Sequence, residues 1–169
     1  YAPTAEQGLY AMGWAQAQDR PTQLLENFAR ALGESAKFEG ARAVPADART
    51  HLFAHYETAQ RNLDRLDGRV RSHLRAFAQG INDFYAAYPD DRPAWWGDRA
   101  VDEAMIIAFS RLFLYNWSID DAYSDLQRGG IRPGVDREQR GSNQFAISPQ
   151  RSAVDAPMLY IDPHLSWWG

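Results

Sequence analysis

The sequence predicts an α+β fold that is mostly helical and ends in one β-hairpin. Two observations lead to this prediction. Between residues 5 and 113, apolar residues recur at spacings of three and four, which places them on one side of successive helices. After residue 141 the spacing changes to an alternation with a period of two, which is typical of a strand. We therefore expect helices first and strands last.

The first three helices are predicted from residues 5–66. Residues 5–18 form the first, with Thr4 as its N-cap. Its apolar side consists of Leu9, Met12 and Ala15. The second begins at Pro21, which suits a first helical turn, and ends at Gly33. Its apolar stripe consists of Leu24, Leu25, Phe28 and Leu32. Residues 40–47 predict a turn-rich break before a third helix, whose apolar residues are Leu52, Tyr56, Ala59, Leu63 and Leu66.

Two further helices precede a polar linker. The fourth has the most regular apolar spacing in the chain and stops at residues 88–93; its apolar residues are Val70, Leu74, Phe77, Ile81 and Phe84. Asp98 or Asp102 caps the fifth, whose broad apolar face predicts deep burial. That face consists of Met105, Ile106, Phe109, Leu112 and Phe113. Residues 129–140 are polar, glycine-rich and without periodicity, so we expect an exposed segment accessible to cleavage.

The last part of the chain predicts a hairpin. Residues 142–148 alternate as a strand, residues 149–157 turn the chain, and residues 158–161 return as the second strand. Ser142 then stands at the start of the first strand and His164 just past the end of its partner. This pairing brings the two residues within plausible reach of one another.

Composition narrows the function classes. The chain has 169 residues, about one domain, and a net charge of -4 without a basic face, which argues against a nucleic-acid partner. The absence of cysteine excludes disulfides and a thiol nucleophile. No apolar run approaches the roughly 20 residues of a membrane span, and residues 1–30 do not resemble a signal peptide. Both ends are typical of cuts through a longer protein, so we expect a fragment.

The bond between Gly141 and Ser142 carries the strongest chemical signal. Cutting it would free a serine that holds both a hydroxyl nucleophile and an α-amine base. The α-amine titrates near ~8 and accepts the hydroxyl proton, whereas the amide nitrogen of an uncut chain does not. Taken alone, Gly-Ser-Asn is an ordinary turn tripeptide.

Three segments together resemble the penicillin acylase family, which includes cephalosporin acylases and acyl-homoserine-lactone acylases. They are Gly141-Ser142-Asn143-Gln144-Phe145-Ala146-Ile147-Ser148 with Asp162-Pro163-His164-Leu165-Ser166-Trp167, then Gly13-Trp14-Ala15-Gln16-Ala17-Gln18-Asp19-Arg20, and Phe77-Ala78-Gln79-Gly80-Ile81-Asn82-Asp83-Phe84. The resemblance implies most of the small chain (residues 1–128), a spacer (129–141) and the start of the large chain (142–169). The complete enzyme would be a four-layer αββα sandwich of the N-terminal-nucleophile hydrolase type.

The resemblance also implies roles for residues. Ser142 is the nucleophile, and Gly141 and Ser142 flank the bond at which the precursor cuts itself. His164 matches the position whose main chain helps to hold the oxyanion and whose side chain assists self-cleavage. Further oxyanion donors would lie beyond Gly169, so we expect no activity from the fragment alone. The candidates for the apolar acyl pocket are Phe113, Leu114, Trp117, Phe145 and Leu165.

The family implies no cofactor for catalysis. Some members hold a structural calcium through a small-chain glutamate, and here Asp120 stands at that place with one carbon less reach. The implied partners are a small-molecule N-acyl substrate, such as a β-lactam side chain or an acyl-homoserine lactone, and the remainder of the large chain in a heterodimer. The implied location is the periplasm or the exterior.

The same residues also have purely structural interpretations. Phe113, Leu114 and Trp117 suit a core as well as a pocket wall. His51, His55 and His73 are predicted on helix surfaces, although His51 and His55, four residues apart, could share a metal ion. As a whole, the chain could instead be a non-catalytic helical interaction domain with an uncut hairpin.

Overall fold

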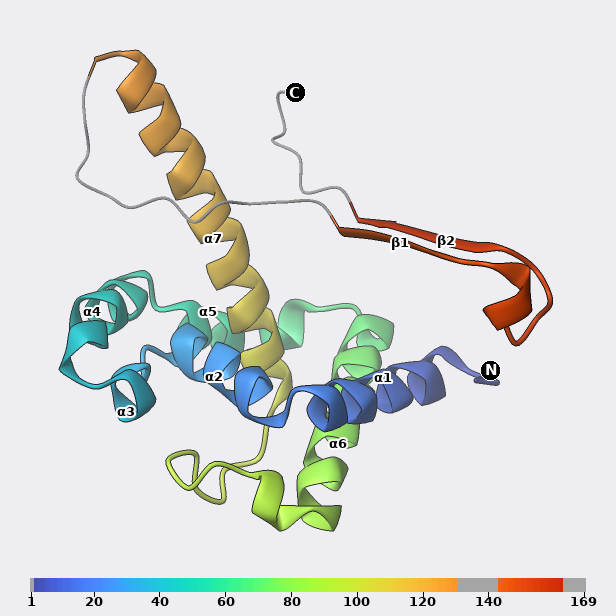
Figure 1. Ribbon diagram of the computed structural model, residues 1–169. Coiled ribbons are helices and arrows are strands. Elements are labelled where there is room, and N and C mark those ends of the chain that lie inside the picture. Colours follow the sequence, from blue (N-terminus) through green and yellow to red (C-terminus); the bar gives the residue numbers. More distant parts are fainter. Residues whose placement is uncertain (1, 131–142, 163–169) are drawn as a thin grey trace. The chain divides into compact units, whose positions relative to one another are not determined.

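The computed structural model describes residues 2–130 and 143–162 (Figure 1). It divides into two compact units, Tyr1–Asn116 and Trp117–Gly169, which we describe separately. The helices are α1 (Ala5–Asp19), α2 (Pro21–Leu32), α3 (Ala36–Glu39), α4 (Val44–Phe53), α5 (His55–Asn62), α6 (Gly68–Ala87) and α7 (Glu103–Arg128). The strands are β1 (Asn143–Ile147) and β2 (Met158–Asp162). This architecture confirms the predicted mostly helical α+β chain.

Helices α1 and α6 lie side by side through two glycines (Figure 1). A Cβ on Gly13 would overlap the carbonyl oxygen of Phe77, and a Cβ on Gly80 would overlap that of Tyr10. Because neither glycine has a side chain, the two backbones approach closely. The N-cap is confirmed, since the side chain of Thr4 accepts a hydrogen bond from the Gln7 amide at 3.2 Å.

The predicted packing side of α1 is wrong in part. Met12 is 46% exposed and Ala15 is also exposed, while Gly13 and Ala17 are the buried residues of the helix. The prediction assigned the larger apolar side chains to the packing side. A helix that packs closely against another backbone instead buries its small residues. Size, rather than hydrophobicity, selects the packing side here.

Helix α2 is confirmed with its predicted ends. Pro21 opens the helix, and Gly33 ends it with φ 71°, a left-handed conformation that glycine adopts without steric cost. Leu25 and Phe28 lie in the main core, which gathers side chains of α1, α2, α6, the loop before α7 and the start of α7. The members of that core are Ala17, Leu25, Phe28, Ala29, Ala78, Ile81, Phe84, Tyr85, Trp96, Val101 and Met105.

Two predictions between residues 40 and 66 are wrong. Helix α4 begins at Val44, inside the predicted break. The buried carboxylate of Asp47, in its first turn, accepts hydrogen bonds from the Ser35 and Ala36 amides at 2.8 Å each, which ties α4 to the start of α3. The predicted third helix is two helices, since the chain turns at Ala54 with φ 45°. Leu52, assigned to the apolar side, is 79% exposed.

Helix α6 is confirmed as predicted and ends where Tyr88 and the following 3-10 turn, Pro89–Asp91, begin. Asp102, not Asp98, caps α7, because its Oδ1 accepts from the Met105 amide at 2.8 Å. The predicted deep burial of α7 holds only for its first turns. Met105 is 3% exposed, whereas Phe113 is 52% exposed.

The hairpin is confirmed. Strands β1 and β2 pair antiparallel, with Asn143 opposite Asp162 and Phe145 opposite Tyr160. The rings of Phe145 and Tyr160 stack with centroids 4.9 Å apart. A 3-10 turn at Pro149–Arg151 begins the connection between the strands. The alternation of side chains was therefore a reliable guide to this element.

Candidate active site

The hairpin defines the framework of the candidate site. The first described residue of β1, Asn143, is covalently bonded to Ser142, and its partner across the sheet is Asp162, two residues before His164. Four of the predicted site residues, Gly141, Ser142, His164 and Leu165, lie outside the described residues. Their predicted roles therefore stay predictions. The nearest described residues are Asn143 and Asp162, which lie opposite one another in the hairpin.

The predicted pocket residues fall in both units. Phe113 and Leu114, on α7 in the helical unit, are 52% and 59% exposed, whereas Phe145, on the hairpin, is 55% exposed and lies against Tyr160. Trp117 begins the second unit and is partly buried. In the proposed enzyme these side chains are candidates for the wall of an acyl pocket. Their meeting in one pocket remains a prediction.

The start of α7 is held by hydrogen bonds from the helical unit. The hydroxyl of Tyr56 on α5 donates to Asp102 Oδ2 at 2.6 Å, while Asp102 Oδ1 caps the helix. Burial and the hydrogen bond to Asp102 raise the pKa of Tyr56, so the hydroxyl remains a donor at physiological pH. This contact between α5 and α7 determines where α7 begins, and hence the position of Phe113 and Leu114 along the helix.

The predicted calcium ligand, Asp120, lies within α7, but its side chain is outside the described part. Its role therefore stays a prediction. Among the described side chains, no group of three or more His, Asp and Glu residues could hold a metal ion. No step of the chemistry is assigned to calcium.

One of the three histidines predicted on helix surfaces is buried. His55 is 3% exposed, so its prediction as a surface residue is wrong. His51 is exposed, and its Nε2 lies 3.0 Å from the carbonyl oxygen of Gly33. The break at Ala54 places the two on different helices, α4 and α5, instead of one turn apart on a single helix. His73 is partly exposed and lies 3.7 Å from Glu6.

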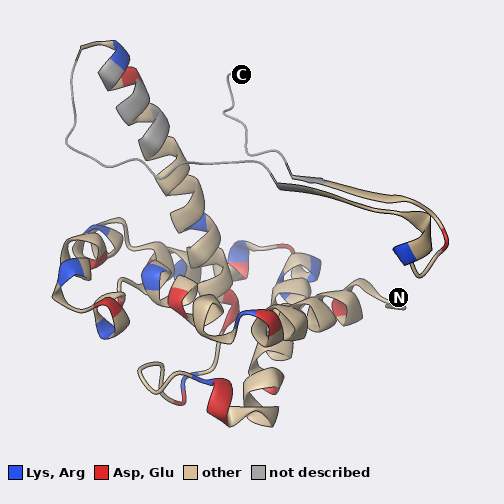
Figure 2. Cartoon of the chain, viewed as in Figure 1, with Lys and Arg blue, Asp and Glu red and all other residues tan. Residues whose placement is uncertain are grey.

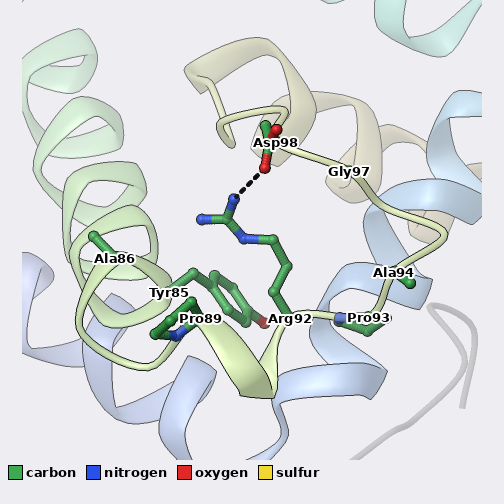
Figure 3. A pocket seen from close by; sticks show the side chains of 8 residues that line it. All are labelled: Tyr85, Ala86, Pro89, Arg92, Pro93, Ala94, Gly97 and Asp98. Atoms are coloured by element: carbon green, nitrogen blue, oxygen red, sulfur yellow. Dashed lines mark ion pairs between the residues drawn. The ribbon is translucent and has the colours of Figure 1, made fainter.

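A separate pocket of about 430 Å³ opens where α6 ends (Figure 3). Arg92 crosses it, with its guanidinium 5.6 Å from the centroid of the Tyr85 ring and 3.7 Å from Asp98. The eight residues that line it are Tyr85, Ala86, Pro89, Arg92, Pro93, Ala94, Gly97 and Asp98. The Tyr85 hydroxyl donates to the carbonyl oxygen of Pro21, and burial raises the pKa of Tyr85. This lining offers no activated nucleophile, so the pocket is not a second candidate for catalysis.

The described helices carry charges of both signs. Figure 2 shows acidic and basic residues mixed along the helices of the described part. Among the described helices, none combines the length and apolar character that a bilayer-spanning helix needs.

The described chain is thus an α+β protein in which a helical unit is followed by an antiparallel hairpin. The family model for penicillin amidase matches residues 1–169, and the chain belongs to this family. This confirms the resemblance found in the sequence.

Two curated relatives show how much of a longer protein the chain represents. It is 24% identical over 208 residues to penicillin acylase 2 proenzyme of a Pseudomonas species (strain SE83), with 91% of this chain and 27% of that protein covered. It is 25% identical over 199 residues to acyl-homoserine lactone acylase PvdQ of Pseudomonas putida, with 97% and 25% covered. The chain therefore spans about a quarter of the length of these relatives.

Proposed function

We propose that the protein containing this chain is an acylase that hydrolyses the linear amide bond of an N-acyl substrate. The nucleophile is Ser142, exposed as a new N-terminus when the precursor cuts itself after Gly141. Family membership supports the class of reaction. The relatives are named for penicillin and for acyl-homoserine lactones, so the substrate class is a small molecule with an acyl group on nitrogen.

One observation carries the assignment of the nucleophile. Strand β1 begins at Asn143, directly after Ser142, and Asn143 pairs with Asp162 at the end of β2. A serine at this point would stand at the end of a sheet, where a freed α-amine can project from the strand instead of entering the ladder. The same register supports His164, two residues past Asp162, as the neighbour of the nucleophile.

The chemistry follows from the two groups of an N-terminal serine. The α-amine takes the hydroxyl proton, and the oxygen attacks the amide carbon to form a tetrahedral oxyanion. Backbone donors, with the main chain of His164 among them, stabilise that oxyanion. The nitrogen leaves as an amine after protonation, and water hydrolyses the acyl-serine ester. In the precursor, the same hydroxyl attacks the Gly141 carbonyl, the Gly141–Ser142 C–N bond breaks to free the protonated α-amine, and water hydrolyses the resulting ester.

The proposed organisation of the whole protein has three parts within this chain. Residues 1–128 belong to the small chain, residues 129–141 to the spacer and residues 142–169 to the start of the large chain. The remainder of the large chain completes a four-layer αββα sandwich and supplies the other oxyanion donors, so this piece is inactive by itself. The proposed location is the periplasm or the exterior.

The test is the intact mass and N-terminal sequence of the full-length protein, compared with a Ser142→Ala variant. We expect a chain that begins Ser142-Asn143-Gln144 in the native protein and only uncut precursor in the variant. Ser148→Ala, which changes an exposed serine at the other end of β1, is the matched control and should be cut normally. Folded but uncut native protein would refute the role of Ser142 and favour the helical interaction domain.

A further inference from the structure

The most unusual buried group in the helical unit is the imidazole of His55, at the corner between α4 and α5. The corner is made by Ala54, whose φ of 45° reverses the chain and turns His55 inward. His55 is 3% exposed. Its ring centroid lies 6.2 Å from that of Phe53 and 5.5 Å from that of Tyr115 on α7, and the Phe53 and Tyr115 rings are 4.2 Å apart.

Neither ring nitrogen of His55 has a hydrogen-bond partner among the described residues. Buried polar atoms are nearly always paired, because an unpaired one loses its hydrogen bonds to water without replacement. An aromatic hydrocarbon of the same shape, such as phenylalanine, would fill this corner without that loss. Position 55 therefore carries a titratable imidazole although an apolar ring would satisfy the packing.

The charges around the ring oppose its protonation. Arg111 on α7 repels a proton on His55, and Glu57 on α5 attracts one. Helix α4 contributes the apolar Phe53, and the buried side chains of α2, which also packs against α5, are all apolar. Burial is the largest effect, and with Arg111 it lowers the pKa of His55 below its ordinary value of 6.5.

We propose that His55 is an acid-sensitive latch between the α4–α5 corner and α7. The neutral ring holds the corner against Tyr115, and a proton on the ring expels it from this apolar site and releases the contact. The residues that lose their support are those in the middle of α7, around Phe113 and Leu114. The latch is a conformational property of the helical unit and does not depend on the proposed acylase chemistry.

The pH range follows from the sign of the shift. A histidine whose pKa is lowered by folding is neutral in the closed state, so an open state binds the proton more readily. The closed state therefore loses stability as pH falls below 6.5, and the loss continues down to the lower pKa of the closed state. One proton raises the opening constant by at most about tenfold per pH unit.

The test is hydrogen exchange of the full-length protein at pH 7.5, 6.5, 5.5 and 4.5, corrected for intrinsic exchange, with peptides that cover residues 53–62 and 103–116. We expect both segments to lose protection below pH 6.5 in the native protein and to keep it in His55→Phe. His73→Gln, which removes a partly exposed histidine on α6, should behave as the native protein does. Equal loss in His55→Phe, or no loss in the native protein, would overturn the latch.

Two further variants keep the proposal testable if His55→Phe does not fold. Arg111→Met removes the repelling charge, which brings the closed-state pKa of His55 nearer its ordinary value, and should reduce the loss of protection between pH 6.5 and 4.5. Glu57→Gln removes the attracting charge and should increase that loss. Both side chains are exposed, so these changes leave the core intact. A loss of protection that does not change in these variants, or that changes in the opposite directions, would show that the His55 proton does not control the contact.

Discussion

The contact between α1 and α6 makes a sharp prediction about Gly80. Gly80→Ala adds a Cβ that would overlap the Tyr10 carbonyl oxygen and lie 2.9 Å from the Trp14 nitrogen. Ordinary contacts are about 3.5–4.0 Å, so full relief of the overlap with the Tyr10 oxygen requires α1 to withdraw by more than about 1 Å. A gap of about 0.5–1 Å already forfeits about a quarter to a half of the dispersion energy across the interface. That interface includes the edge-to-face contact of Trp14 with Phe84, whose centroids are 5.7 Å apart.

The magnitude follows from two opposing effects. Overpacking of this kind costs about 1–3 kcal/mol, and replacing glycine by alanine inside a helix returns up to about 1 kcal/mol. We expect a net loss of about 1–2 kcal/mol, which corresponds to an opening constant for this helix pair larger by about 5–30-fold. Gly68→Ala is the control on the same helix, because a Cβ there meets no atom within 4 Å.

The assay is hydrogen exchange of the α1 and α6 amides in the full-length protein. Gly80→Ala should accelerate exchange in both helices, whereas Gly68→Ala should leave it equal or slower. Gly13→Ala should resemble Gly80→Ala, and the double variant should cost less than the sum because α1 has already moved. If Gly80→Ala exchanges as slowly as Gly68→Ala, the close approach of the two backbones does not exist as described.

Three more substitutions in the helical unit have expected outcomes for unfolding of the full-length protein. Asp47→Asn weakens two hydrogen bonds from backbone amides, at 2.8 Å each, and should cost about 1–2 kcal/mol, with thermal unfolding shifted downward. Ala54→Gly relieves a left-handed conformation at φ 45° and should stabilise by about 0.5–1 kcal/mol; destabilisation would contradict the turn. Arg99→Lys loses the two hydrogen bonds to Glu34, at 3.1 and 2.8 Å, and the stacking on Trp96 at 4.1 Å, so it should cost about 1–2 kcal/mol although charge is kept. An unchanged unfolding midpoint in Arg99→Lys would show that charge alone suffices.

Local signals account for the elements that the sequence predicted well. The end of α2 at Gly33 and the cap of α1 at Thr4 depend on residues within one turn, which a sequence reader sees directly. The hairpin was equally readable, since alternation and turn residues stand next to one another in the chain. In each case the residues that cause the structure are neighbours in sequence.

The wrong predictions have a common cause. Each of these structural features depends on a contact with a residue or a turn that the nearby sequence does not reveal. Asp47 reads as a turn residue, but its carboxylate caps amides twelve and eleven residues earlier. Helix α1 packs on the side that faces Gly80 of α6. The sequence signal that could have predicted this side is the glycine in each helix, Gly13 and Gly80. His55 reads as a surface residue because nothing nearby in sequence announces the bend at Ala54 or the Tyr115 ring.

The candidate site shows the same division between local and distant information. The alternation predicted the strand that begins immediately after Ser142, and the structure confirms this strand, Asn143–Ile147, and its pairing with β2. The proposed pocket would depend on where α7 lies relative to the rest of the proposed enzyme, which no local pattern encodes. Phe113 read as core because its spacing continues that of Met105, yet it is 52% exposed where Met105 is 3%. Spacing along one helix therefore predicts which side chains share a face, but it does not predict how far along the helix the core extends, because that depends on the other helices that pack against it.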